Sequence, residues 1–288
     1  MLRSSVPGSP GSIRRSGTAL LLTGAFVLGS DGAEADTNLG SVAGISYVSD
    51  TTESVAAPFY NEAIAACPSA RPEPLGGGIY PSGDAEQAWV EDLDPWGGPQ
   101  GWWGRFRNVS GPAKTATVFA MCTGRRVKAR RAGGVPVAAN DSRVRRARCP
   151  KDTHVTGGGA TFHGVGRLVS SYPFDGPDAN RVPDDGWAVR YYNLSTTNPA
   201  YLYVDAICLA RKRLRYKKAF GAPSVECPNG GHLTGGGIRH PRGVASSAWM
   251  NTSAPIDTTG DIDSIPDDIW YARATVYPRT VYGICLVG

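Results

Sequence analysis

The sequence predicts an all-β fold made of three internal repeats, each of about 80 residues. Three observations support this prediction. A Cys-Pro pair, a glycine triplet and a Val-x-small-x-Cys segment recur in that order three times along the chain. Glycine and proline are abundant, with 37 and 22 residues. No window holds a sustained helical apolar period, so short strands and many turns are expected.

The first 35 residues have the pattern of a secretory signal peptide. Basic residues precede a short apolar run at 18–28, and Ala33-Glu34-Ala35 is a small-x-small cleavage signature. The run is too short to span a bilayer, and no later stretch is long and apolar enough to do so. We therefore expect residues 1–35 to be removed on export, which leaves a secreted, extracellular chain without a membrane span.

The six cysteines all lie in the expected mature chain, where an even number in an oxidising compartment is typical of disulfides. Only one pairing is the same in every copy and stays inside it. It joins Cys67–Cys122, Cys149–Cys208 and Cys227–Cys285. Closing loops of roughly 60 residues would stabilise each repeat by about 4 kcal/mol. We place the repeats at 36–124, 125–210 and 211–288.

Each repeat is expected to contain four to six short strands in a fixed order. It begins with a strand pair, at 45–55 and 63–66, at 125–137 and 143–148, and at 214–218 and 223–225. The glycine triplet follows the Cys-Pro pair, and a proline then stands four residues before a tryptophan, at Trp103, Trp187 and Trp270. The repeat ends on a strand whose valine, small residue and cysteine share one face, which we expect to be buried.

We interpret the glycine triplets as architecture rather than chemistry. The segments HVTGGG (154–159) and HLTGGG (232–237) lack a Gly-Lys-Ser/Thr ending and a following helix, so they do not match a phosphate loop. Glycine at a strand end allows a bulge and lets another backbone approach closely. Three sheets packed about a pseudo-threefold axis, as in a β-prism, would need this approach once per repeat. Three tandem small β-sandwiches are the alternative arrangement.

The repeated pattern resembles that of uncharacterised secreted bacterial repeat proteins. The resemblance rests on Cys-Pro, the triple glycine about eight residues later, the proline before a tryptophan and the final Val-x-Ala-x-Cys. It covers nearly all of the mature chain and implies no activity, substrate or catalytic residue. The first copy departs most, because it has no His-x-Thr before its glycines and has Gln100-Gly101 in place of Asp-Asp.

Two features suggest binding. The first is a tryptophan-rich segment in repeat 1, residues 89–103, which we expect to be a loop. Trp89, Trp96 and Trp102 have no matching tryptophans in the other repeats. Aromatic faces flanked by polar residues commonly hold sugar rings or apolar partner surfaces. A loop folded on its own tryptophans is the alternative.

The second feature is a pair of basic stripes at 125–148 and 211–218, which contain fifteen of the chain's 30 Lys and Arg residues. Val127, Ala129, Leu214 and Tyr216 alternate with the charges, so each strand would bury one side and present cations on the other. The candidate ligand-binding cations are Arg126, Lys128, Arg130, Arg213, Arg215 and Lys217. Such stripes attract polyanions. Protection of exposed strand edges is the alternative.

The acidic and histidine residues do not form a recognisable catalytic or metal motif. Asp184-Asp185 and Asp267-Asp268 fit turns before a tryptophan. Their neighbourhoods, 175–185 and 257–268, are acidic loops with the hard oxygen ligands that calcium uses, but the spacing matches no EF-hand, and solvated loops without an ion are the alternative. The four histidines are expected on the surface beside structural turns, and we expect no metal site.

We therefore expect a secreted, non-catalytic binding protein whose partner is a glycan or an anionic cell-envelope polymer. Nucleic acid is not expected as the specific partner. The alternatives are a secreted hydrolase that uses the loop carboxylates, and a purely structural extracellular protein.

Overall fold

In the computed structural model each repeat folds into six antiparallel strands, and the first repeat has one further strand before them. The structure describes residues 37–82, 87–96, 100–178, 180–210, 213–241, 243–244, 246–257, 265–277 and 279–288. The expected signal peptide, residues 1–35, lies outside the described residues. All of the described residues belong to one compact unit, 34–288. No helix able to span a membrane occurs in the described part of the chain.

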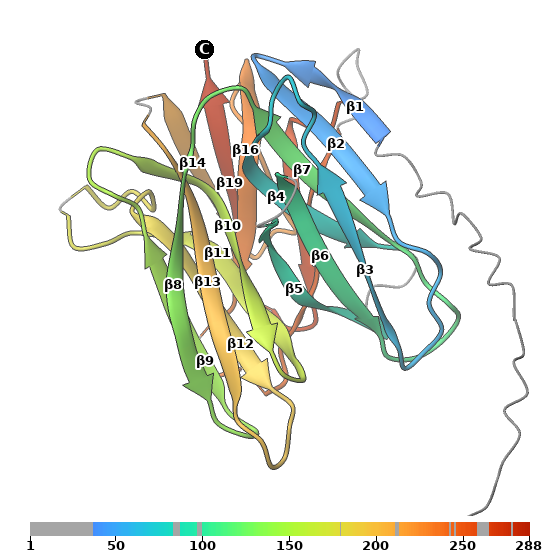
Figure 1. The fold of residues 1–288 in the computed structure, drawn as a ribbon. Coiled ribbons are helices and arrows are strands. Elements are labelled where there is room, and N and C mark those ends of the chain that lie inside the picture. Colours follow the sequence, from blue (N-terminus) through green and yellow to red (C-terminus); the bar gives the residue numbers. More distant parts are fainter. Residues whose placement is uncertain are drawn as a thin grey trace, which may run out of the picture. The chain divides into compact units, whose positions relative to one another are not determined.

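The strand order is the same in each repeat (Figure 1). Repeat 1 contains β1 (Thr37–Val42), β2 (Ile45–Thr51), β3 (Tyr60–Ala66), β4 (Glu73–Pro81), β5 (Ala88–Trp96), β6 (Gly101–Asn108) and β7 (Ala116–Thr123). Repeat 2 contains β8 (Lys128–Val137), β9 (Ser142–Arg148), β10 (His154–His163), β11 (Gly166–Phe174), β12 (Gly186–Asn193) and β13 (Ala200–Leu209). Repeat 3 contains β14 (Leu214–Phe220), β15 (Ser224–Glu226), β16 (Gly231–Arg239), β17 (Met250–Ile256), β18 (Ile269–Ala274) and β19 (Thr280–Val287).

The repeats are joined because every sheet is shared between two of them. The strand orders are β1-β2-β7-β4-β17-β18-β15, β3-β6-β5-β10-β13-β8 and β14-β19-β16-β11-β12-β9. We call these sheets A, C and D. Sheet A combines strands of repeats 1 and 3, sheet C those of repeats 1 and 2, and sheet D those of repeats 2 and 3. This cyclic sharing is the pseudo-threefold arrangement, and the tandem-sandwich alternative is wrong.

The halves of each sheet meet at a short seam. The seam pairs are β4 with β17, β5 with β10 and β11 with β16, and each is registered at one residue pair, such as Ala160 opposite Leu93. In every case the glycine-rich strand of one repeat meets the fourth of the six strands of another. The third glycine of each triplet makes this meeting possible. A Cβ atom at Gly78, Gly159 or Gly237 would collide with the backbone of the neighbouring repeat.

The first glycine of each triplet faces the next triplet around a closed ring. A Cβ atom on Gly76 would collide with the backbone at Gly235 and the residue before it, one on Gly235 with that at Gly157, and one on Gly157 with that at Gly76. The threonine of the HVTGGG motif adds to the ring, because the Thr156 hydroxyl donates a hydrogen bond of 2.8 Å to the carbonyl of Leu75. The motif is therefore architectural, as predicted.

The second glycine of each triplet makes room for a buried tryptophan of its own repeat. The rings over Gly77, Gly158 and Gly236 are those of Trp102, Trp187 and Trp270, which are at most 1% exposed. Repeat 1 thus uses Trp102 here, and the alignment that matched Trp103 to the other repeats is wrong. The strand register agrees, because all three tryptophans lie opposite a proline of the preceding strand.

All three disulfides have the predicted pairing, with separations of 55, 59 and 58 residues, and the structure has no free cysteine. The Val-x-small-x-Cys segments lie on β7, β13 and β19. Their valines, cysteines and alanines are fully buried, as expected. The three disulfides indicate an oxidising environment.

Candidate binding pockets

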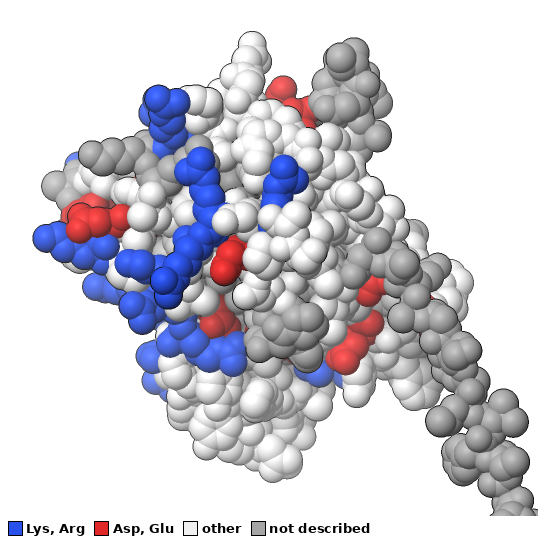
Figure 2. Space-filling view, turned by 45° about the horizontal axis from the view of Figure 1, so that its top comes forward, with Lys and Arg blue, Asp and Glu red and all other residues white. Residues whose placement is uncertain are grey.

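Basic side chains gather on the left of the view in Figure 2, the side where β8, β9 and β14 lie in Figure 1. The six predicted cations of the stripes are all exposed, as expected. Four of them lie on two separate edge strands, β8 of sheet C and β14 of sheet D, and Arg126 and Arg213 lie just before these strands. Leu214 and Tyr216 pack partly buried against the core, as does Val127, whereas Ala129 is exposed, contrary to expectation. The predicted burial pattern is thus confirmed for β14 and only in part for β8.

Two cavities, each of about 560 Å³, open at equivalent positions of sheets D and C. Each lies beside a seam, next to a proline of β11 or β5. This proline recurs in all three repeats as Pro95, Pro173 and Pro255, always opposite the buried tryptophan. The pockets are therefore two versions of one place in the repeated scaffold, with different side chains.

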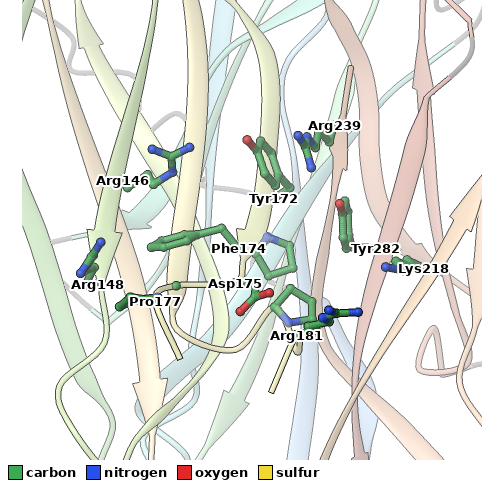
Figure 3. A pocket seen from close by; sticks show the side chains of 13 residues that line it. Arg146, Arg148, Tyr172, Phe174, Asp175, Pro177, Arg181, Lys218, Arg239 and Tyr282 are labelled. Atoms are coloured by element: carbon green, nitrogen blue, oxygen red, sulfur yellow. The ribbon is translucent and has the colours of Figure 1, made fainter. Parts of the chain in front are cut away.

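The cavity on sheet D, which we call the basic pocket, has an aromatic floor (Figure 3). Tyr172 of β11 and Tyr282 of β19 stack with ring centroids 5.9 Å apart and planes at 22°. The Arg239 guanidinium lies 5.3 Å from the centre of the Tyr172 ring. Burial raises the pKa of Tyr282, so this phenol stays neutral and can donate a hydrogen bond. Phe174 extends the floor, with Arg146 over its ring at 5.6 Å.

Five cationic side chains surround this floor: Arg146, Arg148, Arg181, Lys218 and Arg239. Across the described ranges, none of the five has an acidic partner within ion-pair distance. Asp175 is the one acidic residue of the lining. Unpaired cations around a concave surface raise the local concentration of anions and supply charge-assisted hydrogen bonds.

A smaller cavity of about 270 Å³ continues the basic pocket along sheet D. It shares Arg146, Tyr172 and Arg239 with the basic pocket and adds Arg190 and His240. His240 is 2% exposed, which corrects the expectation of a surface histidine. Burial, together with the nearby Arg279 and Arg190, lowers the pKa of His240 to about 4, so the imidazole is neutral near pH 7. The two cavities together form a basic groove rather than a single hollow.

The cavity on sheet C has a different chemistry, and we call it the Asp-Arg pocket. Arg131 of β8 binds Asp205 of β13 through two nitrogens, with Nη2 to Oδ2 at 2.7 Å, and its Nη2 lies 3.2 Å from Asp94 Oδ2 of β5. Thr161 donates a further hydrogen bond to Asp94. Burial, with a smaller contribution from neighbouring Asp205, raises the pKa of Asp94 to about 7. Trp103 forms part of the wall.

The three predicted binding tryptophans do not form one site. Residues 89–103 form the β5–β6 hairpin rather than a loop, with residues 97–99 outside the described residues. Trp102 belongs to the core. Trp89 lies at the start of β5, with its ring 6.0 Å from that of Trp249, and Trp96 lies at the opposite end of the strand. The side chain of Trp96 lies outside the described residues.

The loop carboxylates that the hydrolase alternative would use take part in paired contacts. His154 Nδ1 lies 2.8 Å from Asp184, and His232 contacts Asp267 in the same way. The Asp184 carbonyl also accepts a hydrogen bond from Val155. These contacts hold the turn before the buried tryptophan against the glycine strand. Asp175, Asp178 and Asp185 bring carboxylate oxygens within 4.8 Å of one another. In the acidic loop of repeat 3, residues 258–264 lie outside the described residues.

The sequence did not predict the two pockets, although some of their lining residues, among them Arg131, Arg146, Arg148 and Lys218, belong to the predicted basic stripes. A usable signal was present, since two positions differ between repeats: the residue before the repeated proline, and the residue that follows the valine of the Val-x-small-x-Cys segment. Asp94 and Asp205 in sheet C stand where sheet D has Tyr172 and Tyr282. Repeated positions whose chemistry varies are candidates for binding, because the scaffold does not require a fixed residue there.

No protein-family model matches the chain, and no curated protein matches its sequence.

Proposed function

We propose that the protein is an exported, non-catalytic binding protein whose basic groove on sheet D takes an acidic glycan or another anionic envelope polymer. The observation that supports this is the set of five cations that have no ion-pair partner among the described residues and surround two stacked tyrosines. A sugar ring can lie on the tyrosines while its carboxylate, sulfate or phosphate groups meet the arginines.

The length of the groove favours a chain over a single sugar. The adjoining cavity adds Arg190 to the cations, and Arg239 and Tyr172 line both cavities. An anionic polymer can place successive charges in both hollows. Binding would then have a specific contribution from the tyrosines and a salt-dependent contribution from the arginines.

Export belongs to the same proposal. The pattern of residues 1–35 and the three disulfides both favour a location outside the cytoplasm. An envelope polymer is a partner that such a location would provide.

Binding of acidic oligosaccharides tests the proposal. Calorimetric titration with an oligogalacturonate, a hyaluronan oligosaccharide and a teichoic acid fragment should give saturable binding by at least one ligand, weakened by salt. A Tyr172→Ala variant should then lose at least tenfold in affinity, which corresponds to about 1.4 kcal/mol.

Strand β14 offers a matched control. Lys218 lines the basic pocket, and its neighbour Lys217 is exposed on the opposite face of the same strand. Lys218→Gln should weaken binding severalfold and Lys217→Gln should not. Equal losses in the two variants would instead assign binding to the basic stripes, and no binding by any ligand would contradict the proposal.

A further inference from the structure

The Asp-Arg pocket stands at the position of sheet C that the basic pocket occupies in sheet D. Strand register gives the correspondence, because both places are fixed relative to the third glycine of a triplet, Gly159 or Gly237. The cations Arg131 and Lys218 correspond, as do Thr161 and Arg239. The two hollows have the same volume of about 560 Å³, although β9 contributes to the lining of the basic pocket and β4 and β6 to that of the Asp-Arg pocket.

The polar groups of the Asp-Arg pocket are fixed before any ligand arrives. Asp205 and Asp94 are about 4% exposed and share one Nη2 atom of Arg131. Arg131 is 51% exposed along its side chain, so part of its guanidinium faces the cavity. The carboxylates of Asp94 and Asp205, which accept hydrogen bonds, and the guanidinium of Arg131, which donates them, thus lie side by side in one wall of the cavity.

The rest of the lining includes three further polar residues, Glu73, Gln100 and Thr161, and an apolar part with one aromatic ring. Trp103 of β6 lines the cavity together with Val127 and Ile207. The positions that correspond to Trp103 carry Ala188 in repeat 2 and Tyr271 in repeat 3. The indole is therefore a feature of this pocket rather than of the repeated scaffold.

We propose that the Asp-Arg pocket is a second binding site, which takes a neutral sugar residue. A sugar hydroxyl both donates and accepts hydrogen bonds, so it matches an alternating set of carboxylates and guanidinium. The apolar face of a sugar ring packs on an indole. Among the described lining residues, Glu73, Asp94 and Asp205 outnumber the one cation, Arg131, so this pocket repels the anions that the basic pocket attracts.

This site does not depend on the proposed function of the basic pocket. A cation is a poorer match, because Arg131 already holds both buried carboxylates and would have to be displaced. The Arg131 network also joins repeat 1 to repeat 2, so removing it would disturb the seam. A test should therefore fill the cavity and leave the network intact.

Ala129 provides such a test. It is exposed, lines the pocket and corresponds in register to Tyr216 of repeat 3. Ala129→Tyr thus introduces a side chain that the scaffold already carries at the equivalent position. Its folding is checked by thermal unfolding, and Lys218→Gln in the basic pocket serves as the control variant.

The probes are cellotetraose, xylotetraose, mannotetraose and chitotetraose, titrated calorimetrically at roughly 50 and 500 mM NaCl. At least one should bind with a dissociation constant below about 1 mM that salt does not change. Ala129→Tyr should weaken that binding at least tenfold, and Lys218→Gln should leave it unchanged. The proposal is overturned if no tetrasaccharide binds, or if the folded Ala129→Tyr variant binds as the wild type does. Neither result bears on acidic ligands, whose binding depends on Lys218 and Tyr172.

Discussion

A single methyl group added to the first glycine of a triplet, where the three repeats meet, should destabilise the whole described unit. In a Gly157→Ala variant the Cβ atom would lie 2.5 Å from the carbonyl oxygen of Leu75 and 2.6 Å from the Cα atom of Gly76. Ordinary contacts begin at about 3.4 Å, so the two strands must separate by about 1 Å. Both atoms belong to backbone that is also held in sheet A, and no side chain can rotate out of the way.

We expect this change to cost about 3 kcal/mol, near the upper end for overpacking of a core. For a chain of this size the corresponding fall in Tm is about 6–12 °C. Thermal unfolding, followed by circular dichroism at the β-sheet signal of about 218 nm or in the near-ultraviolet, measures this fall in Tm. Gly133 of β8 is the matched control, since a Cβ atom there would meet nothing within 4 Å. Gly133→Ala should change Tm little or raise it slightly. If Gly157→Ala unfolds at the same temperature as Gly133→Ala, the role assigned to the ring is wrong.

Three further changes probe the core, the disulfides and the Asp-Arg pocket. Trp102→Ala should cost about 3–5 kcal/mol, because it empties a buried site beneath the glycine strand; a variant that keeps its stability and loses only ligand binding would contradict the core assignment. Replacing Cys149 and Cys208 together by alanine should lower the free energy of unfolding by about 4 kcal/mol in guanidinium denaturation, and a loss below about 1 kcal/mol would refute the loop-entropy argument. Asp94 has its pKa raised from 3.8 to about 7, so between these values the folded chain holds a proton that the unfolded chain releases. The free energy of unfolding contributed by this group therefore falls as pH rises through that window. Urea denaturation from pH 4 to 8, a range set by the two pKa values, should show a shallower fall for Asp94→Asn than for the wild type, whereas parallel curves would count against the buried carboxyl.

The repeats, the strand order and the disulfides could be predicted because the sequence pattern that indicates each of them occurs three times. A pattern such as Val-x-Ala-x-Cys fixes which residues share a strand face, whatever the partner strand is. It does not fix which repeat supplies the partner. Seam pairs such as Leu93 with Ala160 join residues far apart in the chain, and the local sequence is equally compatible with three separate sandwiches.

The mistaken match of Trp103 shows that an error of one residue in comparing the repeats exchanges a core residue for a residue that lines a pocket. Trp102 and Trp103 are neighbours, so a shift of one residue places the opposite face of β6 inward. The glycine that precedes the tryptophan was the better guide, since Gly101-Trp102 corresponds to Gly186-Trp187. The basic pocket was missed for a related reason. Tyr172 and Tyr282 come from different repeats and meet only after the sheets are shared.

The sharing of sheets bears on what one repeat could do alone. A single repeat would expose two half-sheets, one ending in its glycine-rich strand and one in its fourth strand, each with unpaired backbone groups. These two edges are complementary, so three identical copies could close the same ring as a homotrimer. Joining the copies in one chain removes the entropic cost of assembling them and frees each copy from being identical. One seam can then carry tyrosines and arginines while another carries aspartates and a tryptophan. A symmetric trimer would carry the same side chains at every seam.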